Sequence, residues 1–267
     1  MVRIDSLSRS FGDIKAVDNL SFEVRPNEIF ALLGPNGAGK TTAIKMILGM
    51  LRPDAGTVQF NGSQVSPDDN SYLSKIGYVP ESCALYENLT GREYLEFIGN
   101  LHHLPESDVQ RKTVKLLDIL ELGEASGQLL REYSKGMKQK ILIISALLHD
   151  PDLIILDEPF SGLDANAVSV FKELFREQSR QGKAVIFCSH ILEVVERLVD
   201  RILIIKDGKE LASGTPEKII EQTGHENLGR AFNELTGAKD IAVQARNIVD
   251  IIGNNNVNQR IEGEKHE

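Results

Sequence analysis

The sequence predicts an α/β protein whose core is a parallel sheet, with an antiparallel β subdomain at the N-terminus and a helical subdomain in the middle. Continuous apolar runs of strand length, at 153–156 and 184–188, are typical of strands buried on both faces of a parallel sheet. The period of the apolar residues becomes helical over about residues 90–122, and strands alternate with helices beyond it. This alternation, with a helical insert, predicts the α/β class.

The first eighty residues contain several segments of strand character. Residues 2–30 are predicted to form short strands, in which 21–24 alternate between apolar and polar and 25–28 form a turn. A further strand at 56–62 ends in an Asn-Gly turn, and another short strand covers 76–80. Closely spaced strands of this kind predict the antiparallel β subdomain.

The middle of the chain predicts three helices. Thr90 and Glu93 form a capping-box pattern ahead of an apolar face, and Pro105 ends this first helix. A second amphipathic helix follows and is stopped by a glycine at 123, and a third helix begins at Ser134. Together these helices make up the predicted helical subdomain, over about residues 84–148.

The last hundred residues contain the final predicted elements of the α/β core and a C-terminal segment that follows them. A helix is predicted over 165–180, and an Asp-Gly turn between 201–206 and 209–212 predicts a β-hairpin. Residues 239–252 predict an apolar-faced helix. The polar and charged residues 253–267 are expected to be disordered.

Charge and composition narrow the classes of function. The chain has 267 residues and a formal net charge of −9, which argues against a general nucleic-acid binder because such proteins neutralise phosphates with Lys and Arg. Cys83 and Cys188 lie far apart without metal-site spacing, so we expect reduced thiols. The N-terminus has no apolar signal region, and the longest apolar run, 141–148, is too short to cross a bilayer. We therefore expect a cytoplasmic protein that does not span a membrane by itself.

A glycine-rich stretch at residues 34–42, GPNGAGKTT, matches the phosphate-binding loop pattern G-x-x-x-x-G-K-[ST]. The run 29–33 before it has strand length, and residues 43–49 after it have helical character, which disfavours a chance match. Such a unit directs backbone N–H groups and the positive end of a helix at an anion. In such a loop Lys40 reaches the β- and γ-phosphates and the Thr41 hydroxyl binds Mg²⁺. The loop residues expected to contact a nucleotide are Gly34, Asn36, Gly37, Ala38, Gly39, Lys40, Thr41 and Thr42.

Two adjacent acids, Asp157 and Glu158, follow the apolar run 153–156, at the strand end where open α/β sheets bind ligands. Asp157 is placed to hold Mg²⁺ through water. Glu158 is placed to accept a proton from an attacking water, or to orient it. Taken alone, the pair also fits an ordinary acidic strand end. The phosphate-binding loop upstream favours the hydrolytic roles.

Three further pieces have weaker signals individually. Ser134 suits an N-cap and Gly136 allows a ligand to approach the backbone, although in isolation this is simply a capped helix. The sequence SGLD at 161–164 comes just after the two acids. His190 follows the strand that ends at Cys188, which is where a γ-phosphate contact from a neighbouring strand end is expected.

The order and spacing of these five pieces resemble the ATP-binding subunit of an ABC transporter, and the likeness covers about residues 2–223. The resemblance implies a P-loop NTPase core that hydrolyses ATP with Mg²⁺. It implies that Glu158 is the catalytic carboxylate and His190 the γ-phosphate sensor. The motifs are a Walker A motif at 34–41, a signature at 134–139, a Walker B motif at 153–158, a D-loop at 161–164 and a switch histidine at 190.

The resemblance also implies partners. Two ATPase subunits, as a homo- or heterodimer, pack head to tail, so that Ser134 and Gly136 of one contact the γ-phosphate held by the other. Asp164 lies across that interface. An integral membrane permease is the other implied partner, which places the ATPase on the cytoplasmic side, peripheral at the inner face of the cell membrane. No nucleic-acid partner is expected.

Three positions differ from the usual residues of the family. Lys135 replaces the first glycine of the signature, which is compatible with function if the side chain points away or helps to neutralise phosphate. Glu81 stands where glutamine is usual; it keeps oxygen ligands for Mg²⁺ but loses the amide donors, so we expect a metal or water contact. Phe11, where tyrosine is frequent, either stacks on adenine or belongs to the core.

The C-terminal part favours an exporter. Residues 227–237 look like the ending of drug-, ion- and polysaccharide-exporter ATPases. We expect an ATPase domain at 1–223 and a C-terminal extension at 224–267. Leu85 and Tyr86 either contact the permease or pack inside the helical subdomain.

A different class of function is also open to the family. A soluble mechanochemical or regulatory ABC protein is disfavoured because the chain has one set of motifs and no coiled-coil heptads. A non-hydrolysing ATP sensor is disfavoured because Glu158 is present.

Overall fold

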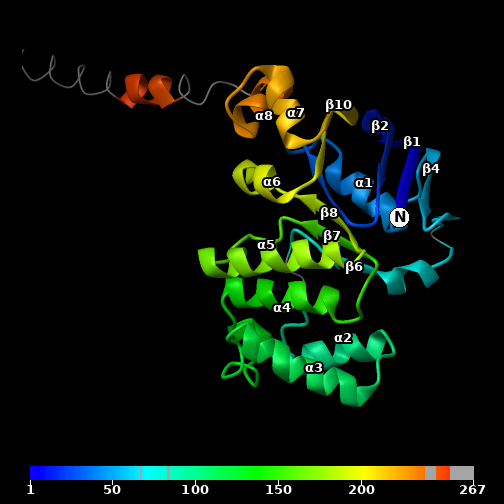
Figure 1. Cartoon of the computed structure of the whole chain (residues 1–267), viewed down its shortest axis with the longest axis vertical. Helices are drawn as coiled ribbons and strands as arrows, with labels where there is room; N and C mark the ends of the chain where they lie inside the picture. Colours follow the sequence, from blue (N-terminus) through cyan, green and yellow to red (C-terminus); the bar gives the residue numbers. More distant parts are fainter. Residues whose placement is uncertain (67, 83–84, 238–244, 253–267) are drawn as a thin grey trace, which may run out of the picture.

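The computed structural model describes residues 1–66, 68–82, 85–237 and 245–252, which form two sheets and the helices around them (Figure 1). The strands are β1 (Val2–Phe11), β2 (Ile14–Val24), β3 (Glu28–Leu33), β4 (Ala55–Phe60), β5 (Ser63–Gln64), β6 (Ile76–Val79), β7 (Leu153–Asp157), β8 (Ala184–Cys188), β9 (Arg201–Lys206) and β10 (Lys209–Gly214). The α-helices are α1 (Lys40–Ile47), α2 (Gly91–Leu101), α3 (Glu106–Ile119), α4 (Lys135–Leu147), α5 (Ala165–Arg180), α6 (Leu192–Leu198), α7 (Pro216–Thr223) and α8 (Leu228–Thr236).

The larger sheet confirms the predicted parallel core. Its strand order is β10-β9-β3-β8-β7-β6. β3 pairs in parallel with β8 and β9, and β7 pairs in parallel with β6 and β8. β10 runs antiparallel to β9 and closes the predicted hairpin. Since strands in a parallel sheet share their direction, the carboxyl ends of β3, β7 and β8 meet at one edge.

The core occupies both faces of this sheet, and β3 shows why its sequence is apolar at every position. Ile29, Ala31 and Leu33 pack on the face covered by α4 and α5. Phe30 and Leu32 pack on the other face, with α1 and the smaller sheet. Alternate side chains of a strand point to opposite faces, so a strand buried on both sides has no polar position to alternate with.

The smaller sheet is antiparallel, with the strand order β2-β1-β4-β5. Its first two strands are longer than predicted, at 10 and 11 residues. The reason is that shifts of register interrupt the pairing of β1 with β2, and Ser6 and Asn19 adopt positive φ angles. Such bulges break the apolar alternation, which is the sequence signal for a continuous strand. Asn61 and Gly62 form the predicted turn between β4 and β5, both at positive φ.

The helical subdomain lies at the end of the molecule opposite the smaller sheet, with α2 and α3 beyond α4 (Figure 1). The predicted capping box at its entry is confirmed: the Glu93 N–H donates to Thr90 Oγ1 at 3.2 Å, and the Thr90 N–H donates to Glu93 Oε2 at 2.8 Å. The expected stop of the second helix at Gly123 was wrong, because α3 ends at Ile119. Leu122 is buried and its N–H bonds to the Leu117 carbonyl, so packing turns the chain before the glycine.

The chain after β10 continues the same core. In α8, Leu228 and Ala231 are buried among residues of the main core. The Leu228 N–H donates to Glu196 Oε2 at 2.9 Å, and Lys206 Nζ donates to the Thr236 carbonyl at 2.8 Å.

Of the helix predicted over 239–252, the described residues 245–252 are helical. The rest of that helix, the predicted disorder of 253–267 and Cys83 lie outside the described residues. Cys188 is a buried free thiol. Among the residues that the structure describes, no helix is both long and apolar enough to cross a bilayer.

We expect Thr90→Ala to lower the free energy of unfolding by about 1 kcal/mol, because α2 loses its N-cap acceptor. Urea unfolding followed by circular dichroism measures this loss. Ser169→Ala is the control, since Ser169 is exposed within α5 and alanine is a better helix former. An equal loss in both variants would contradict the capping role.

Candidate active site

The phosphate-binding loop joins β3 to α1, and its glycines fit a crowded backbone. A Cβ atom at Gly34 would lie 2.3 Å from the Ile205 carbonyl oxygen. A Cβ atom at Gly39, whose φ is +108°, would lie 2.2 Å from the Ala16 carbonyl oxygen. Since neither approach is compatible with a side chain, the tertiary structure as well as the motif requires glycine at both positions. The loop is held further by the Gly208 N–H, which donates to the Ala38 carbonyl at 3.0 Å.

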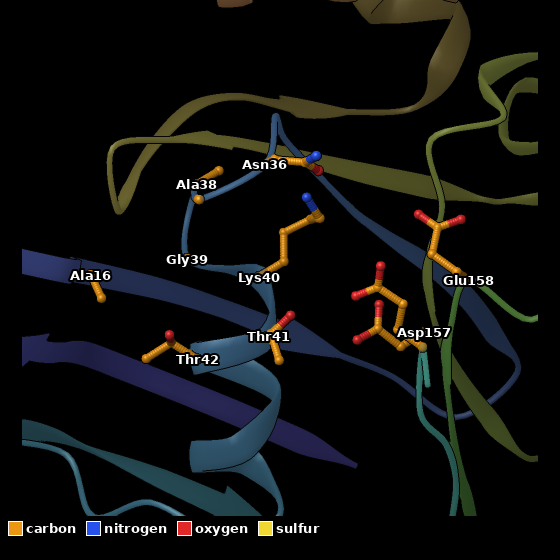
Figure 2. Close-up of a pocket in the computed structure, with 11 residues that line it drawn as sticks. Ala16, Asn36, Ala38, Gly39, Lys40, Thr41, Thr42, Asp157 and Glu158 are labelled. Atoms are coloured by element: carbon orange, nitrogen blue, oxygen red, sulfur yellow. The ribbon is translucent and has the colours of Figure 1, made fainter. Parts of the chain in front are cut away.

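A cavity of about 300 Å³ opens over this loop. Figure 2 shows Lys40 and Thr41, at the start of α1, facing Asp157 and Glu158 across it. Ten of the predicted site residues line it, while Ala16 of β2 lines it without any signal in the sequence. The lining residues are Ala16, Asn36, Gly37, Ala38, Gly39, Lys40, Thr41, Thr42, Glu81, Asp157 and Glu158.

The ammonium group of Lys40 is held inside the loop. Its Nζ donates to the Gly34 carbonyl at 2.6 Å and to the Pro35 carbonyl at 3.1 Å. Gly34 itself is not among the residues that line the cavity, and its carbonyl accepts the bond from Lys40. The positive charge and the start of α1 lie on the same side of the cavity, which suits an anionic ligand.

Asp157, at the end of β7, is a buried carboxylate with a missing partner. Its side chain is 3% exposed, and in the described part of the chain its Oδ2 atom has no hydrogen-bond donor. Burial, which is the largest cause, and the nearby carboxylates of Glu81 and Glu158 together raise the pKa of Asp157 to about 6 against the opposing effect of Lys40. A group of this kind is stabilised by a cation.

Glu158 is held by the residues that follow β8. Its N–H donates to the Cys188 carbonyl at 2.9 Å, and its φ of 50° places it in the left-handed region. The Nδ1 atom of His190 lies 2.9 Å from Glu158 Oε1, and Ser189 Oγ donates to Glu158 Oε2 at 3.3 Å. Both carboxylate oxygens are thereby oriented. Left-handed backbone at a non-glycine residue is unusual and concentrates at functional sites.

The structure brings His190 to Glu158 but not to the cavity wall. The His190 side chain is 80% exposed, which leaves its second ring nitrogen open to solvent. Ser189 was missed by the sequence reasoning. Its only signal is its place between a buried strand and His190.

The signature and the D-loop lie apart from the cavity. Ser134 caps α4 by accepting a bond from the Met137 N–H, as predicted. Asp164 caps α5, and the hydrogen bond from the Ala167 N–H lowers the pKa of its carboxyl group. Neither residue, nor Gly136, is among those that line the cavity. The Lys135 side chain points to the D-loop of its own chain, where Nζ donates to Ser161 Oγ at 2.7 Å.

Phe11 and Tyr86 are both exposed at the surface. Phe11 is 50% exposed at the end of β1, under the guanidinium of Arg9, so the alternative that it belongs to the core was wrong. It does not line the cavity either. Tyr86 is exposed and packs edge-on against Phe97, whereas Leu85 packs against the main core.

The folded pKa of Asp157, about 6, lies above the ordinary value of 3.8, so ionisation of this group destabilises the fold as pH rises through 6. Without nucleotide or divalent cations, we expect Asp157→Asn to raise the free energy of unfolding by about 2 kcal/mol at pH 7.5. The gain should shrink as the pH falls from 6 towards 4, where the wild-type carboxyl is protonated. Denaturant unfolding at pH 7.5 and at pH 4 measures the gain. A gain that is the same at the two pH values would contradict the raised pKa of Asp157.

Known proteins are similar to this chain in sequence and in fold. The family described as ABC transporter matches residues 17–161. An uncharacterised ABC transporter ATP-binding protein of Methanocaldococcus jannaschii is 37% identical over 224 residues, which cover 84% of this chain and 81% of that protein. The Nod factor export ATP-binding protein I of Paraburkholderia xenovorans is 36% identical over 243 residues, which cover 91% of this chain and 79% of that protein.

A solved structure agrees with these relatives. The structure of an ATP-binding subunit of an ABC transporter superposes with a TM-score of 0.82 at 34% identity, covering 88% of this chain and 99% of that one. The matched region contains the phosphate-binding loop and the two acids that face it across the cavity. The chain therefore belongs to the ABC transporter family, as an ATP-binding subunit that hydrolyses ATP.

Proposed function

We propose that this chain drives transport, in the direction of export, through a separate integral membrane permease. ATP closes a dimer of two ATPase subunits, and hydrolysis and product release reopen it. One observation carries the proposed dimer: the cavity collects the phosphate-binding loop with Asp157 and Glu158, while Ser134 and Gly136 of the signature lie outside it. A site so divided is completed by a second subunit.

The phosphate end of the site has the groups that ATP needs. Lys40 and the N-terminus of α1 supply positive charge for the β- and γ-phosphates, and the loop residues from Asn36 to Thr42 line the same cavity. The crowding at Gly34 and Gly39 fixes the course of this loop before any ligand arrives. Binding therefore costs little reorganisation of the loop.

The cavity also fits Mg²⁺. The buried Oδ2 of Asp157 lacks a donor, and Thr41 and Glu81 line the same cavity. In the described part of the chain, no three His, Cys, Asp or Glu side chains lie close enough to hold a metal ion among themselves. Mg²⁺ usually takes only one or two protein ligands and completes its shell with phosphate oxygens and water. We assign Thr41, Asp157 and Glu81 to it; bound there, it neutralises charge that develops on the phosphates.

Glu158 is the proposed general base. Both of its oxygens are oriented by Ser189 and His190, and the side chain opens into the cavity opposite Lys40. It accepts the proton of the attacking water, or holds that water in line with the γ-phosphate. Within the described residues the second ring nitrogen of His190 has no partner, which suits a contact with the γ-phosphate.

The remaining assignments concern groups at the edges of the site. Phe11, exposed at the end of β1, is the proposed stacking partner of adenine. Ser134 and Gly136 contact the γ-phosphate of the partner subunit's nucleotide, and Asp164 lies across the interface. The partner is a second ATPase subunit, identical or different. We keep 1–223 as the ATPase domain and 224–267 as its C-terminal extension.

The proposed permease and direction of transport are supported by three observations. A relative that covers 91% of this chain is named for Nod factor export, and the ending at 227–237 resembles that of exporter ATPases. Tyr86 is exposed beside the signature helix, where Lys138 of α4 pairs with Glu87. The surface formed by Tyr86, Glu87 and Lys138 is the proposed contact with the permease. Such a contact places the chain on the cytoplasmic side, at the inner face of the membrane.

We expect Glu158→Gln to keep ATP binding, to lower turnover by at least about 100-fold, and to accumulate as an ATP-bound dimer, because the base is lost while binding groups remain. Phosphate release and light scattering after size-exclusion chromatography measure the two effects. Glu193→Gln, an exposed acid on α6, is the matched control and should behave as wild type. Normal steady-state hydrolysis by Glu158→Gln would show that another group is the base.

The permease is tested by affinity capture of the Glu158→Gln protein with ATP from detergent-solubilised membranes. We expect a membrane protein with several spans to co-purify in stoichiometric amount, because the closed dimer remains bound to its permease. A stoichiometric soluble partner, or no membrane association, would reject transport and leave the ATPase assignment standing. The Glu193→Gln protein captured in parallel shows whether the association depends on the closed state.

A further inference from the structure

Lys135, the residue that replaces the usual first glycine of the signature, lies against the D-loop of its own chain. Its Nζ donates to Ser161 Oγ at 2.7 Å. Its aliphatic part covers Gly162, where an added Cβ would lie 2.8 Å from Lys135 Cγ and 2.9 Å from Cδ. Gly162 also has a φ of +79°, so both its conformation and the space that Lys135 occupies require glycine there.

Two other residues of α4 meet the same segment. A Cβ added at Gly136 would come within 2.7 Å of the Gly162 carbonyl oxygen. Gln139 is buried and its Nε2 donates to the Pro159 carbonyl at 2.9 Å. The first turns of the signature helix are therefore packed directly on residues 159–162.

This segment in turn holds Glu158. The Ser161 N–H donates to the Glu158 carbonyl at 3.2 Å, which closes a turn on the residue with left-handed backbone. A continuous set of contacts thus runs from the start of α4, through Lys135 and Ser161, to Glu158. Of the hydrogen bonds described above, a glycine at position 135 would remove only the one from Lys135 to Ser161.

We propose that Lys135 is a positioning residue that couples the two ATP sites of the dimer. The inference rests on the proposed dimer, in which the signature of one subunit meets its partner's nucleotide while Glu158 acts on the nucleotide of its own subunit. When α4 engages the partner's γ-phosphate, Lys135 transmits its displacement to Ser161 and so to the turn that orients Glu158. Occupancy of one site thereby sets the hydrolytic geometry of the other.

A double-mutant cycle on the full chain tests this link. Lys135→Met keeps most of the aliphatic stem and removes the ammonium, and Ser161→Ala removes the acceptor. We expect each variant to lower kcat about fivefold, the factor that a net hydrogen-bond free energy of about 1 kcal/mol corresponds to. The Hill coefficient for ATP should fall towards 1 in both. The double variant should be no slower than either single variant, because all three lack the same bond.

The controls distinguish a loss of coupling from a general effect of replacing lysine and from the absence of a dimer. Lys115→Met, an exposed lysine of α3, makes the same chemical change elsewhere and should leave kcat and the Hill coefficient unchanged. Multiplicative effects in the double variant, or hydrolysis by the wild type without cooperativity, would overturn the coupling role. Failure of Glu158→Gln to dimerise with ATP would instead reject the dimer itself.

Discussion

The pairing register of β7 with β8 is the constraint on which the site depends. Asp157 lies opposite Cys188 in this parallel pair, so the next residues of both strands leave the sheet together. The Glu158 N–H then meets the Cys188 carbonyl, and its carboxylate meets Ser189 and His190. A slip of one residue would turn every side chain of β7 to the opposite face and separate these groups. Because β3 pairs with the other side of β8, the phosphate-binding loop opens at the same edge.

The chemistry of the site depends on an unfavourable arrangement of charge that the fold maintains. Asp157 is buried beside two other carboxylates, and its burial together with their charges raises its pKa to about 6. At neutral pH the ionised Asp157 therefore lowers the stability of the free protein, and a cation bound beside it would offset this loss. The same arrangement places Lys40 across the cavity from the acids, so the site presents separate positive and negative sides. Such a site suits a nucleotide with a divalent cation better than either an anion or a cation alone.

The first turns of α4 lie outside the cavity but pack on the segment that follows Glu158. Gln139, Gly136 and Lys135 of α4 contact residues 159–162, and Ser161 closes the turn on Glu158. The start of α4, which is the proposed contact with the partner's nucleotide, and Glu158, the proposed base, thus belong to one packed unit. Packed units of this kind shift between discrete arrangements rather than deforming gradually, which suits a switch driven by ligand binding.

The sequence determined the local features, because their causes lie within a few residues of one another. Thr90 and Ser134 cap their helices as predicted, and the phosphate-binding loop forms where its glycines and the flanking strand and helix place it. The continuous apolar run of β7 and the acids that follow it were likewise predictable. Most of the residues that line the cavity were therefore predictable from their spacing along the chain.

The tertiary structure alone decided which distant residues meet. Ala16 reaches the cavity and Ser189 reaches Glu158 through strand pairing, and Lys135 bonds to Ser161 because α4 packs on the segment after β7. The bulges of β1 and the early end of α3 likewise arise from pairing and burial, which override local pattern. Capping, turns and periodicity act over a few residues, whereas register and packing depend on segments more than a hundred residues apart in the chain.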